Sequence, residues 1–91
     1  QRRRTVHTED ALAWALHRAG RSAEALPHAR AATATGYRDA AFLYHRGMIE
    51  RAVGERAAAR ASLTRALAVN PAFSPIGARE ARRALDGLEA S

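Results

Sequence analysis

A regular spacing between small side chains constrains the fold of this chain more than any other feature. Gly20 and Gly54 lie 34 positions apart, and the same offset aligns Ala13 with Gly47, Ala25 with Ala59 and Ala32 with Ala66. Self-similarity at a period of this size is typical of helix–turn–helix units that bury their apolar faces against one another. The sequence therefore predicts two copies of one small helical unit.

Glycine, proline and capping residues divide the sequence into five predicted helices. They run from Thr5 or Thr8 to Ala19, from Ser22 to Gly36, from Asp39 to about Gly54, from Glu55 to Val69, and from Ser74-Pro75 to about Glu89. Ser22, Asp39 and Ser74 are predicted N-caps, and Gly20 is predicted to end the first helix in a left-handed conformation. The loops are short, so neighbouring helices are predicted to be antiparallel and the fold class to be all-α.

Alanine occupies 24 of the 91 positions, which favours helices because alanine has the highest helix propensity. Small side chains also let helix backbones approach closely, as we expect at Gly47. A chain of 91 residues forms one small domain with a thin core. In the last helix the predicted apolar stripe consists of Ile76, Ala81, Ala84, Leu85 and Leu88.

Pro27 lies inside the predicted second helix, where it removes a backbone donor and its ring meets the carbonyl group of the preceding turn. Either this helix begins after Pro27, or it continues with a kink there. We expect the kinked helix, with Pro27 on its outer face and with Leu26 and Ala29 on its inner face.

These residues resemble the tetratricopeptide-repeat (TPR) family in its bacterial-type form. The matching positions are Leu12, Ala13, Leu16, Gly20, Ala25, Leu26 and Ala32 in the first unit, and Gly47, Gly54, Ala59, Leu63, Ala66 and Asn70-Pro71 in the second. The resemblance covers residues 6–71 and implies a right-handed solenoid of two repeats, 6–39 and 40–73, with a capping helix at 74–89. It also implies that further repeats precede Gln1.

Two positions of the second unit depart from the TPR pattern. Leu12 and Leu16 of the first unit correspond to Arg46 and Glu50, so charged side chains replace apolar ones. We expect these substitutions to weaken the third helix and to shift its register.

The resemblance implies a protein-interaction scaffold, because in TPR proteins the first helix of each repeat lines a concave groove that binds a peptide or a partner helix. The groove positions implied here are His7, Asp10, Trp14, His17, Tyr44, His45, Met48 and Arg51, with Arg79 and Arg82 continuing from the last helix. Two alternatives stay open for Trp14, which either lines the groove or packs as core under a neighbouring helix. The lysine and asparagine clamp of chaperone-binding TPR proteins is not expected, because its positions carry Asp10, Trp14 and His45.

The net charge of +6 reflects 15 arginines and no lysine. An arginine-rich helical nucleic-acid binder is the alternative function, with affinity from phosphate contacts. A bias in coding composition would explain the same arginines without any role in binding. Arginines gathered on one face would favour nucleic acid, whereas arginines scattered over both faces would favour the scaffold.

The isolated chain is also expected to self-associate, through the groove or through an N-terminal face with Leu12 and Leu16.

No sequence pattern predicts an enzyme, a cofactor site or a metal site. The chain has no cysteine, no two of its four histidines are spaced to share one turn of a helix, and it has no glycine-rich phosphate loop. The histidines are expected on the surface, and Glu9 and Asp10 are explained by the positive end of a helix dipole. No apolar run approaches the roughly 20 residues that span a bilayer. No targeting segment is visible, which leaves the cytoplasm as the default compartment.

Overall fold

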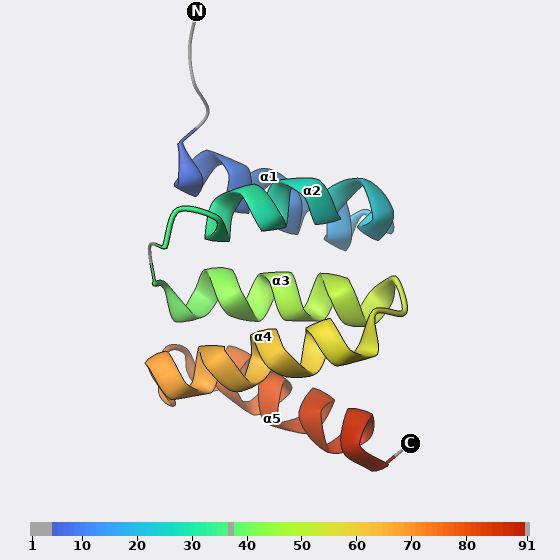
Figure 1. The fold of residues 1–91 in the computed structure, drawn as a ribbon, viewed down its shortest axis with the longest axis vertical. Helices are drawn as coiled ribbons and strands as arrows, with labels where there is room; N and C mark the ends of the chain where they lie inside the picture. The colour runs from blue at the N-terminus through green and yellow to red at the C-terminus, as the bar shows by residue number, and fades with distance from the viewer. Residues whose placement is uncertain (1–4, 37, 91) are drawn as a thin grey trace, which may run out of the picture.

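The computed structural model describes residues 5–36 and 38–90, and over these residues the chain is helical with no strand. Five helices follow one another, in the order α1 (Val6–Arg18), α2 (Ser22–Thr33), α3 (Ala40–Ala52), α4 (Arg56–Val69) and α5 (Pro75–Ala90). Successive helices run in opposite directions (Figure 1). The predicted all-α class and the predicted order of helices are confirmed, although α2 ends at Thr33, before Gly36.

Local side-chain contacts start three of the helices at the predicted residues. Thr5 caps α1 by accepting a hydrogen bond from the amide of Thr8 at 3.1 Å. Asp39 caps α3 in the same way, by accepting hydrogen bonds from two amides of its first turn. Ser74 caps α5, and Pro75 takes the first helical position, where a missing donor costs nothing. These contacts satisfy amides that a helix start leaves without intrahelical partners.

The predicted N-cap at Ser22 is wrong. Arg21 occupies the cap position without a side-chain cap, while Ser22 is the first residue of α2 and its hydroxyl shares a hydrogen bond with His17. The turn before α2 is set by Gly20, whose φ of 83° lies in the left-handed region, and Gly54 repeats this conformation after α3 with a φ of 89°. Because the turn at Gly20 is so tight, Ser22 falls one residue too late to cap the helix.

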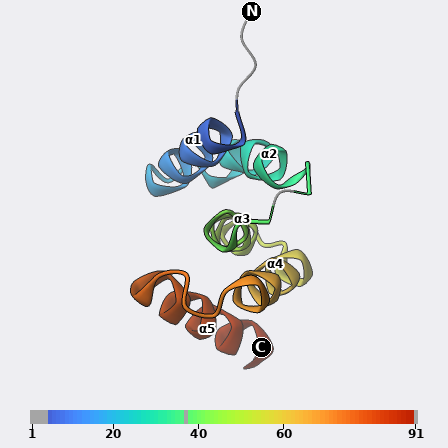
Figure 2. The same cartoon turned by 90° about the vertical axis from the view of Figure 1, so that its left-hand side faces the viewer.

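The helices form two side-by-side pairs and a fifth helix. α1 packs against α2, α3 packs against α4, and α5 contacts both α3 and α4 (Figure 1). The end-on view places α1, α3 and α5 on one side of the molecule, and α2 and α4 on the other (Figure 2). α1 contacts α3, and α3 contacts α5, along the first of these sides. We call it the α1–α3–α5 face.

The bounds of the helices repeat at the interval of the small residues. α3 begins and ends one such interval after α1, from 6 to 40 and from 18 to 52, and α4 begins one interval after α2, from 22 to 56. The N-caps Thr5 and Asp39 share this offset. α5 departs from it, because it begins at Pro75 rather than at residue 74. A delay of one residue rotates the faces of α5 by about 100° from the position that the interval predicts.

Small side chains let the paired helices come close together. Ala13, Ala25 and Ala29 are buried in one cluster, and Gly47 lies against Leu63 where α3 meets α4. A Cβ atom at position 47 would lie 2.6 Å from Leu63 Cγ, which is too short for two carbon atoms. The predicted close contact at Gly47 is therefore confirmed.

Pro27 lies on the exposed side of α2, and the helix continues through it. Leu26 and Ala29 are buried, so the predicted placement of the proline is confirmed.

Ile76 contradicts the prediction that it belongs to the apolar stripe of the last helix, because 69% of its surface is exposed. The step from Ile76 to the buried Ala81 is a rotation of about 140° around the helix axis. Ile76 therefore points away from the core.

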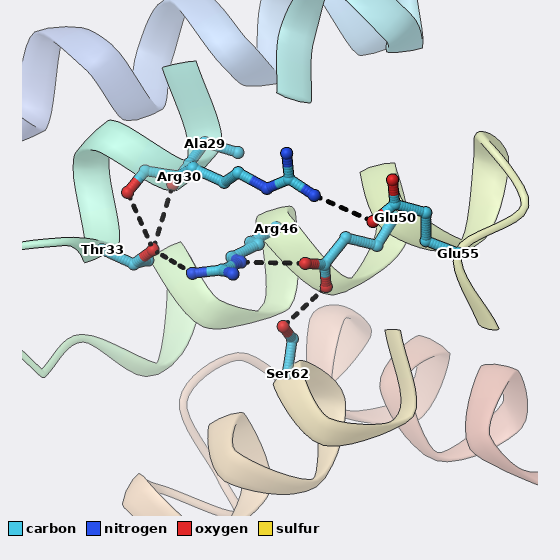
Figure 3. Close-up of polar contacts among 7 residues, drawn as sticks. All are labelled: Ala29, Arg30, Thr33, Arg46, Glu50, Glu55 and Ser62. Carbon is cyan, nitrogen blue, oxygen red and sulfur yellow. Dashed lines mark hydrogen bonds and ion pairs between the residues drawn. The ribbon is translucent and has the colours of Figure 1, made fainter. Parts of the chain in front are cut away.

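A charged network around one buried carboxylate lies where the first unit carries leucines (Figure 3). Glu50 is completely buried, and its carboxylate accepts hydrogen bonds from Arg46 Nε at 2.9 Å and from the Ser62 hydroxyl at 2.7 Å. Arg46 also donates to the Thr33 hydroxyl at 2.8 Å, so the network joins α2, α3 and α4. α3 keeps the interval of the small residues because these charges have partners, and the predicted register shift is wrong.

Candidate functional site

Five aromatic rings gather along the α1–α3–α5 face. They belong to Trp14 and His17 of α1, Tyr44 and His45 of α3, and Phe73 of the loop before α5, and we call them the aromatic cluster. The centroid of the Trp14 ring lies 4.1 Å from that of His45, 5.0 Å from that of His17 and 5.6 Å from that of Tyr44. Phe73 extends the cluster at 5.4 Å from Tyr44. The structure thus brings together four of the predicted groove residues.

Asp10 fixes the position of His45 in this cluster. Its two carboxylate oxygens lie 2.8 Å and 3.0 Å from Nδ1 of His45, and the contact joins α1 to α3. Held in this way, the imidazole stacks on the indole of Trp14 with an angle of 24° between the rings. Asp10 itself is only 8% exposed, so its predicted place as an open groove residue is wrong. It orients a neighbour instead.

Tyr44 is also buried, with 6% of its surface exposed, because α5 and Phe73 cover it. Its hydroxyl donates a hydrogen bond to Glu80 of α5. Burial, that hydrogen bond and the negative charge of Glu80 all raise the pKa of Tyr44, so it stays a neutral donor. The prediction of an exposed Tyr44 is therefore wrong, and this residue ties α3 to α5 beneath the face.

His17 closes the other end of the cluster. Its Nδ1 shares a hydrogen bond with the Ser22 hydroxyl at 2.8 Å, which joins α1 to the start of α2. Burial lowers the pKa of His17, and its electrostatic interactions with Arg18 and His45 lower that pKa further. The imidazole is therefore neutral at pH 7.

Trp14 is partly core, as one of the two alternatives for it predicted. Its side chain is half-buried and packs against the core cluster that contains Leu43, Leu63 and Leu88. Trp14 is not fully buried, and part of its surface stays exposed. Trp14 therefore contributes both to the core and to the surface beside it.

An open pocket lies between α3 and α5 on the same face. It is lined by Met48 and Arg51 of α3 and by Glu80, Arg83 and Ala84 of α5, and we call it the α3–α5 pocket. Two of the four predicted groove residues on α3, Met48 and Arg51, are thus brought together with residues of α5 that were not predicted for the groove.

The one-residue delay of α5 decides which of its arginines lies beside Met48. Arg82 follows Met48 by the interval that separates Gly20 from Gly54, but its guanidinium donates to the carbonyl oxygen of Pro71 at 2.8 Å. Because α5 begins one residue late, Arg83 lines the pocket instead of Arg82. The Ser74-Pro75 start signal predicted this later start and would have identified Arg83 had it been given precedence over the repeat interval.

The remaining histidines make structural contacts outside the aromatic cluster. His7, a predicted groove residue, is exposed and lies edge-on to Phe42, with ring centroids 5.4 Å apart. His28 Nδ1 lies 2.7 Å from Glu9 Oε1, and this contact joins α2 to α1. His17, His28 and His45 are all half-buried, so the prediction of surface histidines holds for His7 alone.

The described residues contain no group of three or more histidine, aspartate or glutamate side chains placed to hold a metal ion. Each buried side-chain nitrogen and oxygen in residues 5–36 and 38–90 has a hydrogen-bond partner. No helix in this part of the chain is long and apolar enough to cross a membrane. The α1–α3–α5 face carries the aromatic cluster and, beside it, the α3–α5 pocket with its apolar and charged side chains.

Comparison with known protein families, with curated proteins and with solved structures finds no match to the chain. The chemistry of the α1–α3–α5 face is therefore the basis for inferring its function.

Proposed function

We propose that this chain is a protein-interaction scaffold of the TPR type that binds a peptide or a partner helix on the α1–α3–α5 face. The observation that carries the proposal is the grouping of half-buried Trp14 and Met48 with exposed Arg51 and Arg83 on this one face. Aromatic, methionine and arginine side chains are the types that protein interfaces enrich. The repeat interval that relates α3 to α1 supports a solenoid of two repeats and a final helix.

Hydrogen bonds already fix the side chains around Trp14, so binding would cost little conformational entropy there. His45 is held by Asp10 and stacks on the indole, and His17 is held by Ser22 on the same helix pair. Ordering flexible side chains at an interface costs free energy, so a surface that is already ordered binds more tightly.

The positions of the arginines favour this proposal over a nucleic-acid binder. Arg30 of α2 pairs with Glu55 at 2.8 Å, and Arg56 and Arg60 of α4 donate to the carbonyl oxygen of Leu88. These three arginines make contacts within the protein. The exposed pairs Arg38/Arg65 and Arg51/Arg83 line two different pockets, so the arginines are scattered and not gathered on one face. Nucleic-acid binding relies on cations gathered along one surface and free to meet phosphates.

Selection from a phage-displayed library of short random peptides tests the proposal. We expect selected peptides to bind Met48→Ala about tenfold more weakly than the wild type, because that change removes an apolar contact in the centre of the face. Val69→Ala is the matched control, since Val69 is an exposed apolar residue at the end of α4. Its affinity should equal that of the wild type.

The opposite pattern would overturn the proposal. If Trp14→Ala and Met48→Ala leave peptide affinity unchanged while arginine substitutions on α2 and α4 abolish it, binding occurs on the other side of the molecule. Affinity for single-stranded DNA that exceeds peptide affinity at physiological salt would favour the nucleic-acid binder instead.

A further inference from the structure

Two arginines of the α3–α5 pocket have no partner within the described part of the chain. Arg51 lies in the last turn of α3, and Arg83 lies in the middle of α5. Both are exposed, and neither guanidinium makes a hydrogen bond or an ion pair with another residue of 5–36 or 38–90. Arg46 and Arg30, by contrast, are paired with carboxylates at 2.9 Å and 2.8 Å. The pocket therefore presents two guanidinium groups that are not paired with a carboxylate in the described ranges.

The floor of the pocket is apolar. Ala84 is buried with 3% of its surface exposed, and Met48 packs against the same core cluster. Glu80 is the one acidic residue in the lining, and it accepts the hydrogen bond of the Tyr44 hydroxyl. Two guanidinium groups beside a thioether and a methyl group match a ligand that carries both a carboxylate and an aliphatic chain.

Resting on the proposed function, we infer that the α3–α5 pocket binds an acidic segment of a partner protein. A glutamate or aspartate side chain of the partner contacts Arg51 and Arg83, and a neighbouring apolar side chain lies on Met48 and Ala84. Guanidinium groups form paired, charge-assisted hydrogen bonds with carboxylates, which gives both strength and direction. The net charge of +6 attracts an acidic partner from a distance.

A second pair of exposed arginines provides a control of equal charge. Arg38 and Arg65 line a different pocket together with Ala68 and Val69, and they too make no ion pair or hydrogen bond through their guanidinium groups in the described ranges. Arg38 lies in the loop before α3, whereas Arg51 and Arg83 both project from helices. Groups on helices hold a binding geometry better than groups on loops, so the α3–α5 pocket is the better carboxylate site.

Two synthetic peptides test the inference by fluorescence anisotropy at physiological ionic strength. The first alternates leucine with glutamate at helical spacing, and the second replaces each glutamate by glutamine. We expect the wild type to bind the glutamate peptide about tenfold more tightly. The variant Arg51→Gln/Arg83→Gln should lose this preference, while Arg38→Gln/Arg65→Gln should keep it despite the same change in net charge.

Several outcomes would overturn the inference. Equal loss of the preference in both double variants would show a general charge effect without a defined pocket. Failure of the glutamate peptide to bind, or its displacement by single-stranded DNA at lower concentration than by unlabelled peptide, would exclude an acidic protein segment as the occupant. If both peptides bind the wild type equally and Met48→Ala weakens both, the scaffold stands and only its preference for acidic partners falls.

Discussion

Gly47 and Leu63 fill the space that two alanines fill in the first helix pair. The residues one repeat interval earlier are Ala13 and Ala29, and all four positions are buried. In the first pair two alanine side chains share this volume. In the second pair the Leu63 side chain occupies it, and a Cβ at position 47 would lie only 2.6 Å from Leu63 Cγ. Protein interiors have no spare volume, so the residues at 47 and 63 depend on each other.

We expect Gly47→Ala to destabilise the protein by about 1–3 kcal/mol, because the new Cβ forces Leu63 to move. In a Leu63→Ala background the same change should be neutral or stabilising by up to about 1 kcal/mol, because it fills space and alanine favours the helix. Urea unfolding of the wild type, both single variants and the double variant measures this cycle. Additive effects would contradict the close packing of the two residues.

Glu50 allows a similar test of the buried network. Glu50→Leu is expected to cost about 2–4 kcal/mol, because Arg46 and Ser62 lose their acceptor. The triple variant Arg46→Leu/Glu50→Leu/Ser62→Ala should recover most of this loss, since replacing a whole buried charged group with apolar side chains is often neutral or stabilising. Thermal unfolding measures both. A triple variant less stable than Glu50→Leu would show that the network stabilises α3 more than leucines do.

At the scale of single helices, the sequence predicted what is decided within one turn. Thr5, Asp39 and Ser74 are caps because each side chain reaches an amide two or three residues along the chain. Gly20 and Gly54 end their helices because they adopt a left-handed conformation. Such contacts need no information from distant residues, so sequence patterns predicted most of them. Ser22 is the exception, because Arg21 takes the cap position and the Ser22 hydroxyl bonds His17 instead.

Local sequence patterns could not predict the contacts between helices. Asp10 is buried because of His45, which follows 35 residues later, and Tyr44 is covered by α5 and bonded to Glu80, 36 residues later. Nothing near Asp10 or Tyr44 in the sequence indicates these partners. The groove positions on α3 that need no distant partner, such as Arg51, remained exposed as predicted.

Pro27 makes α2 the helix most open to improvement by a single substitution. We expect Pro27→Ala to raise the free energy of unfolding by about 1–2 kcal/mol, because alanine returns a backbone donor and the proline side chain is exposed. Pro75→Ala is the matched control and should bring no gain, since proline suits the first position of α5. Thermal unfolding followed by circular dichroism compares the two. A lower midpoint for Pro27→Ala would show that α2 depends on the ring.

At the scale of the whole molecule, the neutral state of His17 links stability to pH. Burial, Arg18 and His45 lower its pKa in the folded state below the ordinary 6.5. As the pH falls below 6.5, the unfolded chain therefore binds a proton before the folded one does, and this contribution to stability is lost. We expect the wild type to lose more stability than His17→Asn between neutral pH and the folded pKa of His17. Urea midpoints across this range measure the difference, and parallel curves would contradict it.

The first helix pair is expected to promote self-association. No described helix covers the side of α1 and α2 that faces away from α3 (Figure 1). Leu12 is half-buried, and it corresponds to Arg46, which reaches back toward α2. Sedimentation equilibrium should show a mass that rises with concentration, and Leu12→Glu should reduce the rise. A control change in the α3–α5 pocket, Met48→Glu, should not. A monomer at every concentration would contradict this expectation.

The stack of Trp14 on His45 makes the intrinsic tryptophan fluorescence a reporter of the contact between α1 and α3. Trp14 is the single tryptophan in the sequence, so all indole emission comes from the junction between α1 and α3. The emission of an indole depends on the groups that touch it, so it changes when the two rings separate. Circular dichroism, in contrast, sums the signal of all five helices. A change in the emission before helicity falls would therefore show that α1 separates from α3 before the helices unfold, without any added label.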